Sequence, residues 1–151
     1  MNINDTIVSQ STPKGVGPTA VIRVSGKNSI DIVNKIFPWL DLNKVDSHTL
    51  HFGSIIYDKV IIDEVVISIF KEPRSYTKEN IVEISCHGSE IIIKKIILSL
   101  IDLGARTAEK GEFTFRSFIN GNIDLSQAEA VSDLISGKSE NAHKIAINHL
   151  K

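Results

Sequence analysis

The sequence predicts an α+β fold with two layers, in which two main helices pack on a mixed or antiparallel sheet and an all-helical segment follows. Three observations support this prediction. Short segments in which apolar and polar residues alternate dominate the first part of the chain, as expected of strands. Two segments among them carry apolar residues at helical spacing, and from Gly111 onward the pattern is helical throughout.

The composition is that of a globular protein with room for one ordinary domain, or for one small domain plus part of another. The 151 residues are 42% hydrophobic and 23% charged. Lys and Arg (17) nearly cancel Asp and Glu (18), so the basic balance expected of a strong RNA-binding surface is missing. Cys86 is the one cysteine, which excludes an internal disulfide.

Neither a signal peptide nor a membrane span is expected. The first five residues lack a basic region followed by an apolar one. The most apolar run, residues 91–103, contains two lysines and is too short to cross a bilayer. A reducing, soluble compartment is the resulting expectation.

The elements before residue 111 follow from these patterns in order. Strands are expected at 6–9, 20–25, 49–57, 61–70 and 81–86, with a short strand-like piece around Arg106. Asp58-Lys59 should connect two of these strands in a hairpin. One helix is expected from Ser29 until Pro38 ends it, and another from Gly88-Ser89 to a carboxy-terminal cap at Gly104.

The remaining chain should form helices. Ser126 to Glu129 fits a capping box, so a helix is expected to begin there. Its apolar stripe would consist of Ala128, Val131, Leu134 and Ile135. Gly137 should end this helix and Ser139 should cap another one.

Two glycine-containing segments look like phosphate-binding loops but lack the required context. Gly15 to Ala20 matches the spacing of a dinucleotide-binding motif, yet a strand follows where a helix must begin. Gly137-Lys138-Ser139 resembles the end of a P-loop, but position 132 is Ser132 and a helix precedes it. The sequence therefore predicts no GTP site in these residues.

No catalytic residue and no metal site are predicted. His48 and His51 should point to opposite faces of a strand, and so should the neighbours Cys86 and His87. Metal ligation and nucleophile activation both require convergent side chains. Cys86 is expected to be a small core residue.

Arg23 and Glu83 are the polar residues that stand out, since each lies on a strand face that should be half-buried. Two interpretations are open. The pair could be a structural ion pair. Alternatively, it could line a small-molecule pocket, where the carboxylate accepts two hydrogen bonds from a flat heterocycle and the cation binds an acidic tail or a ring carbonyl.

Several motifs in order resemble the tRNA uridine-modifying GTPases, the MnmE or TrmE family. They are Asp5–Val8 with Thr12-Pro13-x-Gly15, Ile22–Gly26, Pro73–Thr77, Val82–Gly88, Gly111–Thr114 and Phe118–Ala130. The resemblance covers essentially the whole chain.

The resemblance implies an organisation. Residues 1–118 would form a folate-binding and dimerisation domain like the glycine-cleavage T-protein, and residues 119–151 would begin a helical domain whose inserted GTPase domain is absent here. The parent protein would hydrolyse GTP with potassium and magnesium, whereas this piece alone would not be catalytic. Its location would be cytoplasmic in a bacterium, or mitochondrial or plastid in an organelle.

The resemblance also implies cofactors, partners and site residues. Arg23 and Glu83 match family positions that contact a tetrahydrofolate derivative, 5-formyl or 5,10-methylene. Asn122 stands where the family usually carries a lysine contact. The homodimer would work with a flavoprotein partner on carbon 5 of the wobble uridine of tRNA.

Three functions follow as hypotheses. The first is folate binding with dimerisation, and the second is a dimerisation scaffold with a decayed folate site. The third is a folate-dependent transferase that acts alone.

Overall fold

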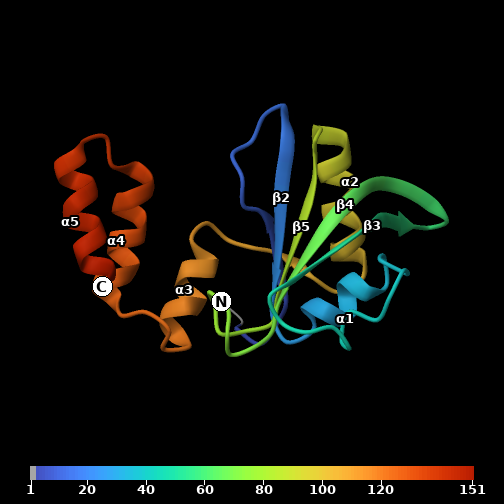
Figure 1. The fold of residues 1–151 in the computed structure, drawn as a ribbon, viewed down its shortest axis with the longest axis horizontal. Helices are drawn as coiled ribbons and strands as arrows, with labels where there is room; N and C mark the ends of the chain where they lie inside the picture. The colour runs from blue at the N-terminus through green and yellow to red at the C-terminus, as the bar shows by residue number, and fades with distance from the viewer. Residues whose placement is uncertain (1–2) are drawn as a thin grey trace.

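A mixed sheet of six strands forms the centre of the molecule in a computed structural model, which describes residues 3–151 (Figure 1). The strands are β1 (Ile7–Gln10), β2 (Gly17–Ser25), β3 (Thr49–Tyr57), β4 (Val60–Phe70), β5 (Ile81–Gly88) and β6 (Arg106–Thr107). Their order is β3-β4-β5-β2-β1-β6, and all neighbours run antiparallel except β1 and β6. The predicted α+β class is confirmed.

Two helices, α1 (Ser29–Asn34) and α2 (Glu90–Asp102), pack on one face of this sheet. Alternation along the strands sends Ile22 of β2 and Ile84 of β5 into this core, and both are fully buried. The helix predicted from Ser29 to Pro38 is shorter than expected. After Asn34 the chain continues in tight turns, where the N–H of Ile36 donates to the carbonyl of Val33.

The predicted hairpin between β3 and β4 is confirmed, and the geometry of its turn explains why Asp58 suits this position. Asp58 and Lys59 have φ angles of 50° and 63°. Two successive residues with positive φ are typical of the tight turns that suit the right-handed twist of paired strands. Asp tolerates this conformation better than most residues.

A strand follows the start of the segment that resembles a dinucleotide-binding motif, as predicted, and it begins earlier than expected, at Gly17. Gly17 begins β2 and lies opposite Gly88 of β5. A Cβ atom added to Gly88 would come within 2.2 Å of the Gly17 carbonyl oxygen. These glycines therefore allow two strands to approach closely, and no helix begins within residues 15–20.

Three helices follow the sheet: α3 (Glu112–Ile119), α4 (Leu125–Ser136) and α5 (Glu140–Leu150). α4 and α5 form a hairpin at one end of the molecule, and the β3–β4 hairpin lies at the other end (Figure 1). The predicted capping residue for α5 is confirmed, because the side chain of Ser139 accepts a hydrogen bond from the N–H of Ala142.

The capping box predicted at Ser126 and Glu129 is wrong. The box is formed two residues earlier by Asp124, which accepts from the N–H of Gln127, while the Gln127 side chain accepts from the N–H of Asp124. Both pairs fit the sequence rule, and the helix begins at the earlier one. Between residues 3 and 151, no helix is long and apolar enough to cross a membrane.

Candidate functional site

Arg23 and Glu83 lie directly opposite each other on the antiparallel strands β2 and β5. The Arg23 Nε atom lies 3.1 Å from Glu83 Oε1, so the predicted ion pair is present. Both residues are on the face of the sheet that α1 and α2 leave uncovered, which we call the outer face. Their side chains are 24% and 26% exposed, which leaves both groups accessible to solvent.

Two aromatic rings hold the Arg23 guanidinium in place. Its central carbon lies 5.7 Å from the ring centre of Tyr76 and 5.2 Å from that of Phe113. A guanidinium near aromatic faces is attracted to them and loses freedom to rotate. The Tyr76 ring is itself fixed, because its hydroxyl lies 2.9 Å from Thr114 Oγ1.

The terminal nitrogens of Arg23 remain open for another partner. Within the part of the chain that the structure describes, only its Nε atom forms a hydrogen bond, to Glu83. A guanidinium carries five N–H donors, so most of its hydrogen-bonding capacity is unused. The pair therefore combines a fixed position with free donors, as a binding group requires.

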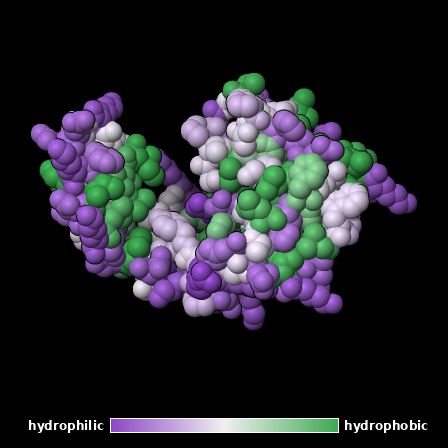
Figure 2. Space-filling model, in the orientation of Figure 1, coloured by the Kyte–Doolittle hydropathy of each residue, from purple (hydrophilic) through white to green (hydrophobic). Residues whose placement is uncertain are grey.

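Arg23 lines a cavity of about 560 Å³ between the outer face of the sheet and α4, whereas its partner Glu83 is not among the lining residues. This size lies in the range of small-molecule sites. β1 and the residue after it contribute Ser9, Gln10 and Ser11, the loop before α3 contributes residues 108–111, and α4 contributes Val131 and Ile135. A hollow between the sheet and the α4–α5 hairpin is visible in the space-filling view (Figure 2).

Asn122, the third predicted site residue, does not line this cavity. Its side-chain amide donates to the carbonyl of Tyr76 at 2.9 Å and to Ser117 Oγ at 3.1 Å. The structure thus brings Arg23 and Glu83 into contact, whereas Asn122 is linked to Arg23 through Tyr76, whose carbonyl accepts from Asn122 and whose ring contacts Arg23.

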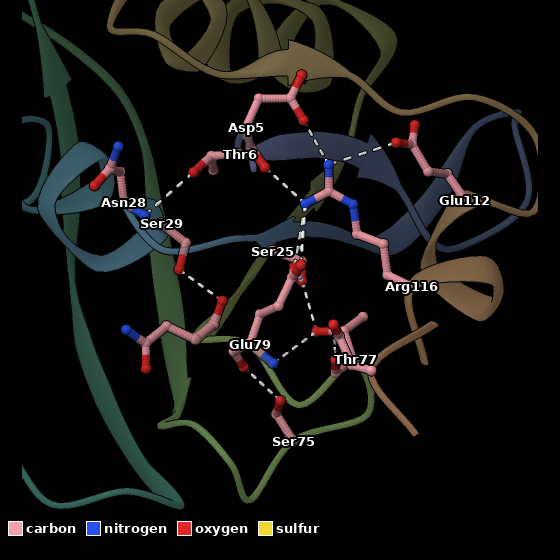
Figure 3. Close-up of polar contacts among 12 residues, drawn as sticks. Asp5, Thr6, Ser25, Asn28, Ser29, Ser75, Thr77, Glu79, Glu112 and Arg116 are labelled. Atoms are coloured by element: carbon pink, nitrogen blue, oxygen red, sulfur yellow. Dashed lines mark hydrogen bonds and ion pairs between the residues drawn. The ribbon is translucent and has the colours of Figure 1, made fainter. Parts of the chain in front are cut away.

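A second cluster of charges lies deeper on the outer face, around Arg116 of α3, and sequence reasoning missed it (Figure 3). Arg116 is fully buried. Its guanidinium contacts three carboxylates: Asp5 at 2.5 Å, Glu79 at 3.2 Å and Glu112 at 3.5 Å. We call these four residues the Arg116 cluster.

Arg106 and two hydroxyl groups complete the surroundings of this cluster. Arg106 Nε lies 2.6 Å from Asp5, and its Nη2 atom lies 2.7 Å from Glu112. The buried Ser25 hydroxyl lies 2.8 Å from Glu79 and 2.7 Å from Thr77 Oγ1. Each carboxylate therefore meets at least one cation or hydroxyl group, as buried charges require.

The surroundings of the cluster lower the pKa values of Asp5 and Glu112. Hydrogen bonds from Arg106, and with them those from Arg116, lower the pKa of Asp5 against the opposing effect of burial. For Glu112, burial acts to raise the pKa, but hydrogen bonds from Arg106 and from the Glu109 N–H outweigh it and the pKa is lowered. Both acids are thus stabilised as carboxylates, in a role that the fold itself explains.

Cys86 and His87 lie on opposite faces of β5, as predicted. Cys86 is 4% exposed and belongs to the core, and burial raises the pKa of its thiol to about 11. The His87 side chain points outward instead and pairs with Asp63 at 2.8 Å.

Gly137-Lys138-Ser139 lies between α4 and α5 and has no strand before it. Among residues 3–151, no three His, Cys, Asp or Glu side chains are placed to hold a metal ion.

The fold and the site thus define an α+β domain with an arginine–glutamate pair beside a cavity, joined to a helical hairpin. Comparison with known proteins narrows this class. Residues 6–122 match the family model described as the GTP-binding protein TrmE N-terminus, and the chain belongs to this family.

Relatives of this chain cover nearly all of it. It is 48% identical over 150 residues to a tRNA modification GTPase MnmE of Cytophaga hutchinsonii, covering 99% of this chain and 33% of the relative. A protein of the same name from Flavobacterium psychrophilum is 51% identical over 154 residues, covering 100% and 33%. A third, from Bacillus thuringiensis, is 48% identical over 149 residues, covering 97% and 32%. The chain thus spans about a third of the length of these relatives.

Proposed function

We propose that this chain binds a tetrahydrofolate derivative, 5-formyl or 5,10-methylene, at the cavity beside Arg23 and Glu83. The observation that carries the proposal is the partly exposed ion pair, in which two rings hold Arg23 in place at a cavity of about 560 Å³. An ion pair with a purely structural role does not require a cavity beside it. A cofactor with a flat polar ring and an acidic tail can contact both the ion pair and the cavity.

The chemistry of the pair suits the pterin ring of a folate. That ring presents an amino group beside a ring N–H, and a carboxylate such as Glu83 can accept both hydrogen bonds in parallel. The free terminal nitrogens of Arg23 can donate to a ring carbonyl or to a carboxylate of the cofactor. In this arrangement Arg23 stays bound to Glu83 through Nε and keeps the carboxylate oriented.

Asn122 contributes to the proposed site indirectly. It supports the backbone of Tyr76, whose ring lies against Arg23. The amide lacks the charge that the usual family lysine would bring near an acidic tail. We therefore place the tail's main charged partner elsewhere, and Lys110 at the cavity rim is the nearest candidate among the lining residues.

We propose further that the whole protein acts in tRNA modification, as the names of its relatives indicate. Residues 1–118 would bind folate and dimerise, and residues 119–151 would begin the helical domain. GTP, potassium and magnesium would bind in a GTPase domain outside residues 1–151. The dimer would act in the cytoplasm with a flavoprotein partner on the wobble uridine of tRNA, and the folate would supply the one-carbon unit.

Calorimetry with 5-formyltetrahydrofolate tests the folate site. Glu83→Gln keeps the shape of the side chain but removes the charge, so we expect affinity to fall about 10- to 100-fold. Glu64→Gln is the matched control, because Glu64 is an exposed glutamate on β4 that neither pairs with Arg23 nor lines the cavity, and it should bind like wild type. Absence of binding by wild type, or equal binding by wild type and Glu83→Gln, would refute the proposed site.

A dimerisation scaffold is the second candidate function, and one observation supports a docking surface. Leu50 and Phe52 lie on the outer face of β3, and each is 69% exposed. Neighbouring apolar side chains exposed to this degree are typical of an interface. We propose that a second copy of the chain covers them.

Sedimentation of wild type and Phe52→Glu tests this interface. The charge should convert a dimer to a monomer, whereas Ile61→Glu, at an exposed isoleucine near the β3–β4 turn, should leave the dimer intact. A dimer that binds no folate would favour the scaffold over the cofactor site. A wild-type monomer would refute dimerisation through this face.

A further inference from the structure

We propose that α4 supplies the apolar wall of the cofactor site, through Val131 and Ile135, so that the bound cofactor bridges the sheet and the α4–α5 hairpin. This inference rests on the proposed folate binding. It adds two specificity-determining residues and a link between cofactor occupancy and the position of the helical hairpin.

The two walls of the cavity differ in chemistry. The wall on the sheet side carries the polar side chains of Ser9, Gln10 and Arg23. The wall on the α4 side carries the apolar side chains of Val131 and Ile135. A site with one polar and one apolar wall selects a ligand that has both kinds of surface.

The exposure of Ile135 shows that little of the described chain packs against it. Ile135 is 83% exposed, the second highest value among the exposed large hydrophobic side chains after Val16. Val131 lies four residues earlier and therefore on the same side of the helix. Apolar surface on the α4–α5 hairpin is turned toward the sheet across the hollow (Figure 2). A ligand in the cavity would cover this surface.

The hairpin is built as a unit of its own, which allows occupancy to influence its position. α4 packs against α5 and against α3. The Gln127 side chain donates to the Leu150 carbonyl at 3.0 Å and ties the two helices together. The cavity lies between α4 and β1. A molecule bound in it would contact both elements and so connect the helical hairpin to the sheet.

The chemistry of a tetrahydrofolate fits both walls at once. Its pterin ring is polar, whereas its aminobenzoyl ring is flat and largely apolar. With the pterin at Arg23 and Glu83, we place the aminobenzoyl ring against Val131 and Ile135. Contact with two aliphatic side chains would remove apolar surface on both partners from water.

Calorimetry with 5-formyltetrahydrofolate on this 151-residue chain tests the wall. Val131→Ala with Ile135→Ala introduces the best helix former at both positions of α4 and removes the apolar contact, so affinity should fall about tenfold. Ile145→Ala is the matched control, because Ile145 is 58% exposed on α5 and does not line the cavity. It should bind like wild type.

Hydrogen exchange supplies a second measurement that does not depend on the variants. Saturating 5-formyltetrahydrofolate should slow amide exchange in α4 of the wild-type chain, because the bound cofactor holds the helix against the sheet. Unchanged exchange in α4, or unchanged affinity in the double variant while Glu83→Gln loses affinity, would overturn this inference and leave the folate site standing. Unchanged affinity in Glu83→Gln as well would overturn the folate site itself.

Discussion

Two arginine–carboxylate arrangements lie on the same outer face of the sheet, and they differ in almost every physical respect. Arg116 is fully buried, and its guanidinium contacts three carboxylates. Arg23 is 24% exposed, pairs with one carboxylate and lies beside a cavity. Both are ion pairs by distance, so distance alone does not distinguish a structural role from a binding role.

The difference lies in what remains available for a ligand. Around Arg116, cations and N–H groups lower the pKa values of Asp5 and Glu112, and the surrounding protein excludes solvent from the guanidinium. Around Arg23 the aromatic rings fix the guanidinium while its terminal nitrogens stay open. We infer that the Arg116 cluster anchors α3 to the sheet and that the Arg23–Glu83 pair binds the ligand.

The largest expected effect is on stability when the Arg116 cluster is broken. Arg116→Met leaves Asp5, Glu79 and Glu112 without their shared cation, so the free energy of unfolding should fall by about 3–5 kcal/mol. Urea unfolding followed by circular dichroism measures this. A loss below about 1 kcal/mol would show that the cluster does not anchor α3.

Acid should weaken the same cluster. The pKa values of Asp5 and Glu112 lie below their ordinary values of 3.8 and 4.5, so at acid pH the unfolded chain binds more protons than the folded one. This stabilisation is complete above the ordinary pKa values and is lost as pH falls through the lowered ones. Urea unfolding from about pH 6 to about pH 3 should show the decline, with a shallower slope in Glu112→Gln. Equal slopes would contradict this assignment.

The smallest expected effect on stability belongs to the other pair. Arg23→Met removes a partly exposed ion pair and keeps an apolar stem between the two rings, so the free energy of unfolding should fall by less than about 1 kcal/mol. The same urea experiment measures it beside Arg116→Met. A loss as large as that of Arg116→Met would mean that the Arg23 pair is structural, and the comparison would fail.

Local patterns predicted those parts of the fold that neighbours in sequence determine. Asp58-Lys59 specified a hairpin turn, and Ser139 specified a helix start, because the backbone geometry at each depends on the residues themselves. Alternation on two strands placed Arg23 and Glu83 on half-buried faces, and the register of β2 with β5 then set them opposite each other. The capping box failed because Asp124–Gln127 and Ser126–Glu129 satisfy the same rule.

The Arg116 cluster could not be predicted because its partners come together only in three dimensions. Glu112 and Arg116 are four residues apart on one helix, a spacing typical of an exposed surface pair. Their burial depends on Asp5, more than a hundred residues away, and on Glu79 from the loop before β5. The cavity beside Arg23 has the same origin, since α4 and β1 are distant in sequence.

One measurement tests the central claim most directly: 5-formyltetrahydrofolate affinity of a charge-swapped variant, Arg23→Glu with Glu83→Arg. The swap keeps an ion pair between β2 and β5, so the free energy of unfolding should stay within about 1 kcal/mol of wild type. It also exchanges donors for acceptors at the cavity, so affinity for the cofactor should fall at least about 100-fold. A stable swapped chain that binds the cofactor as tightly as wild type would contradict the account.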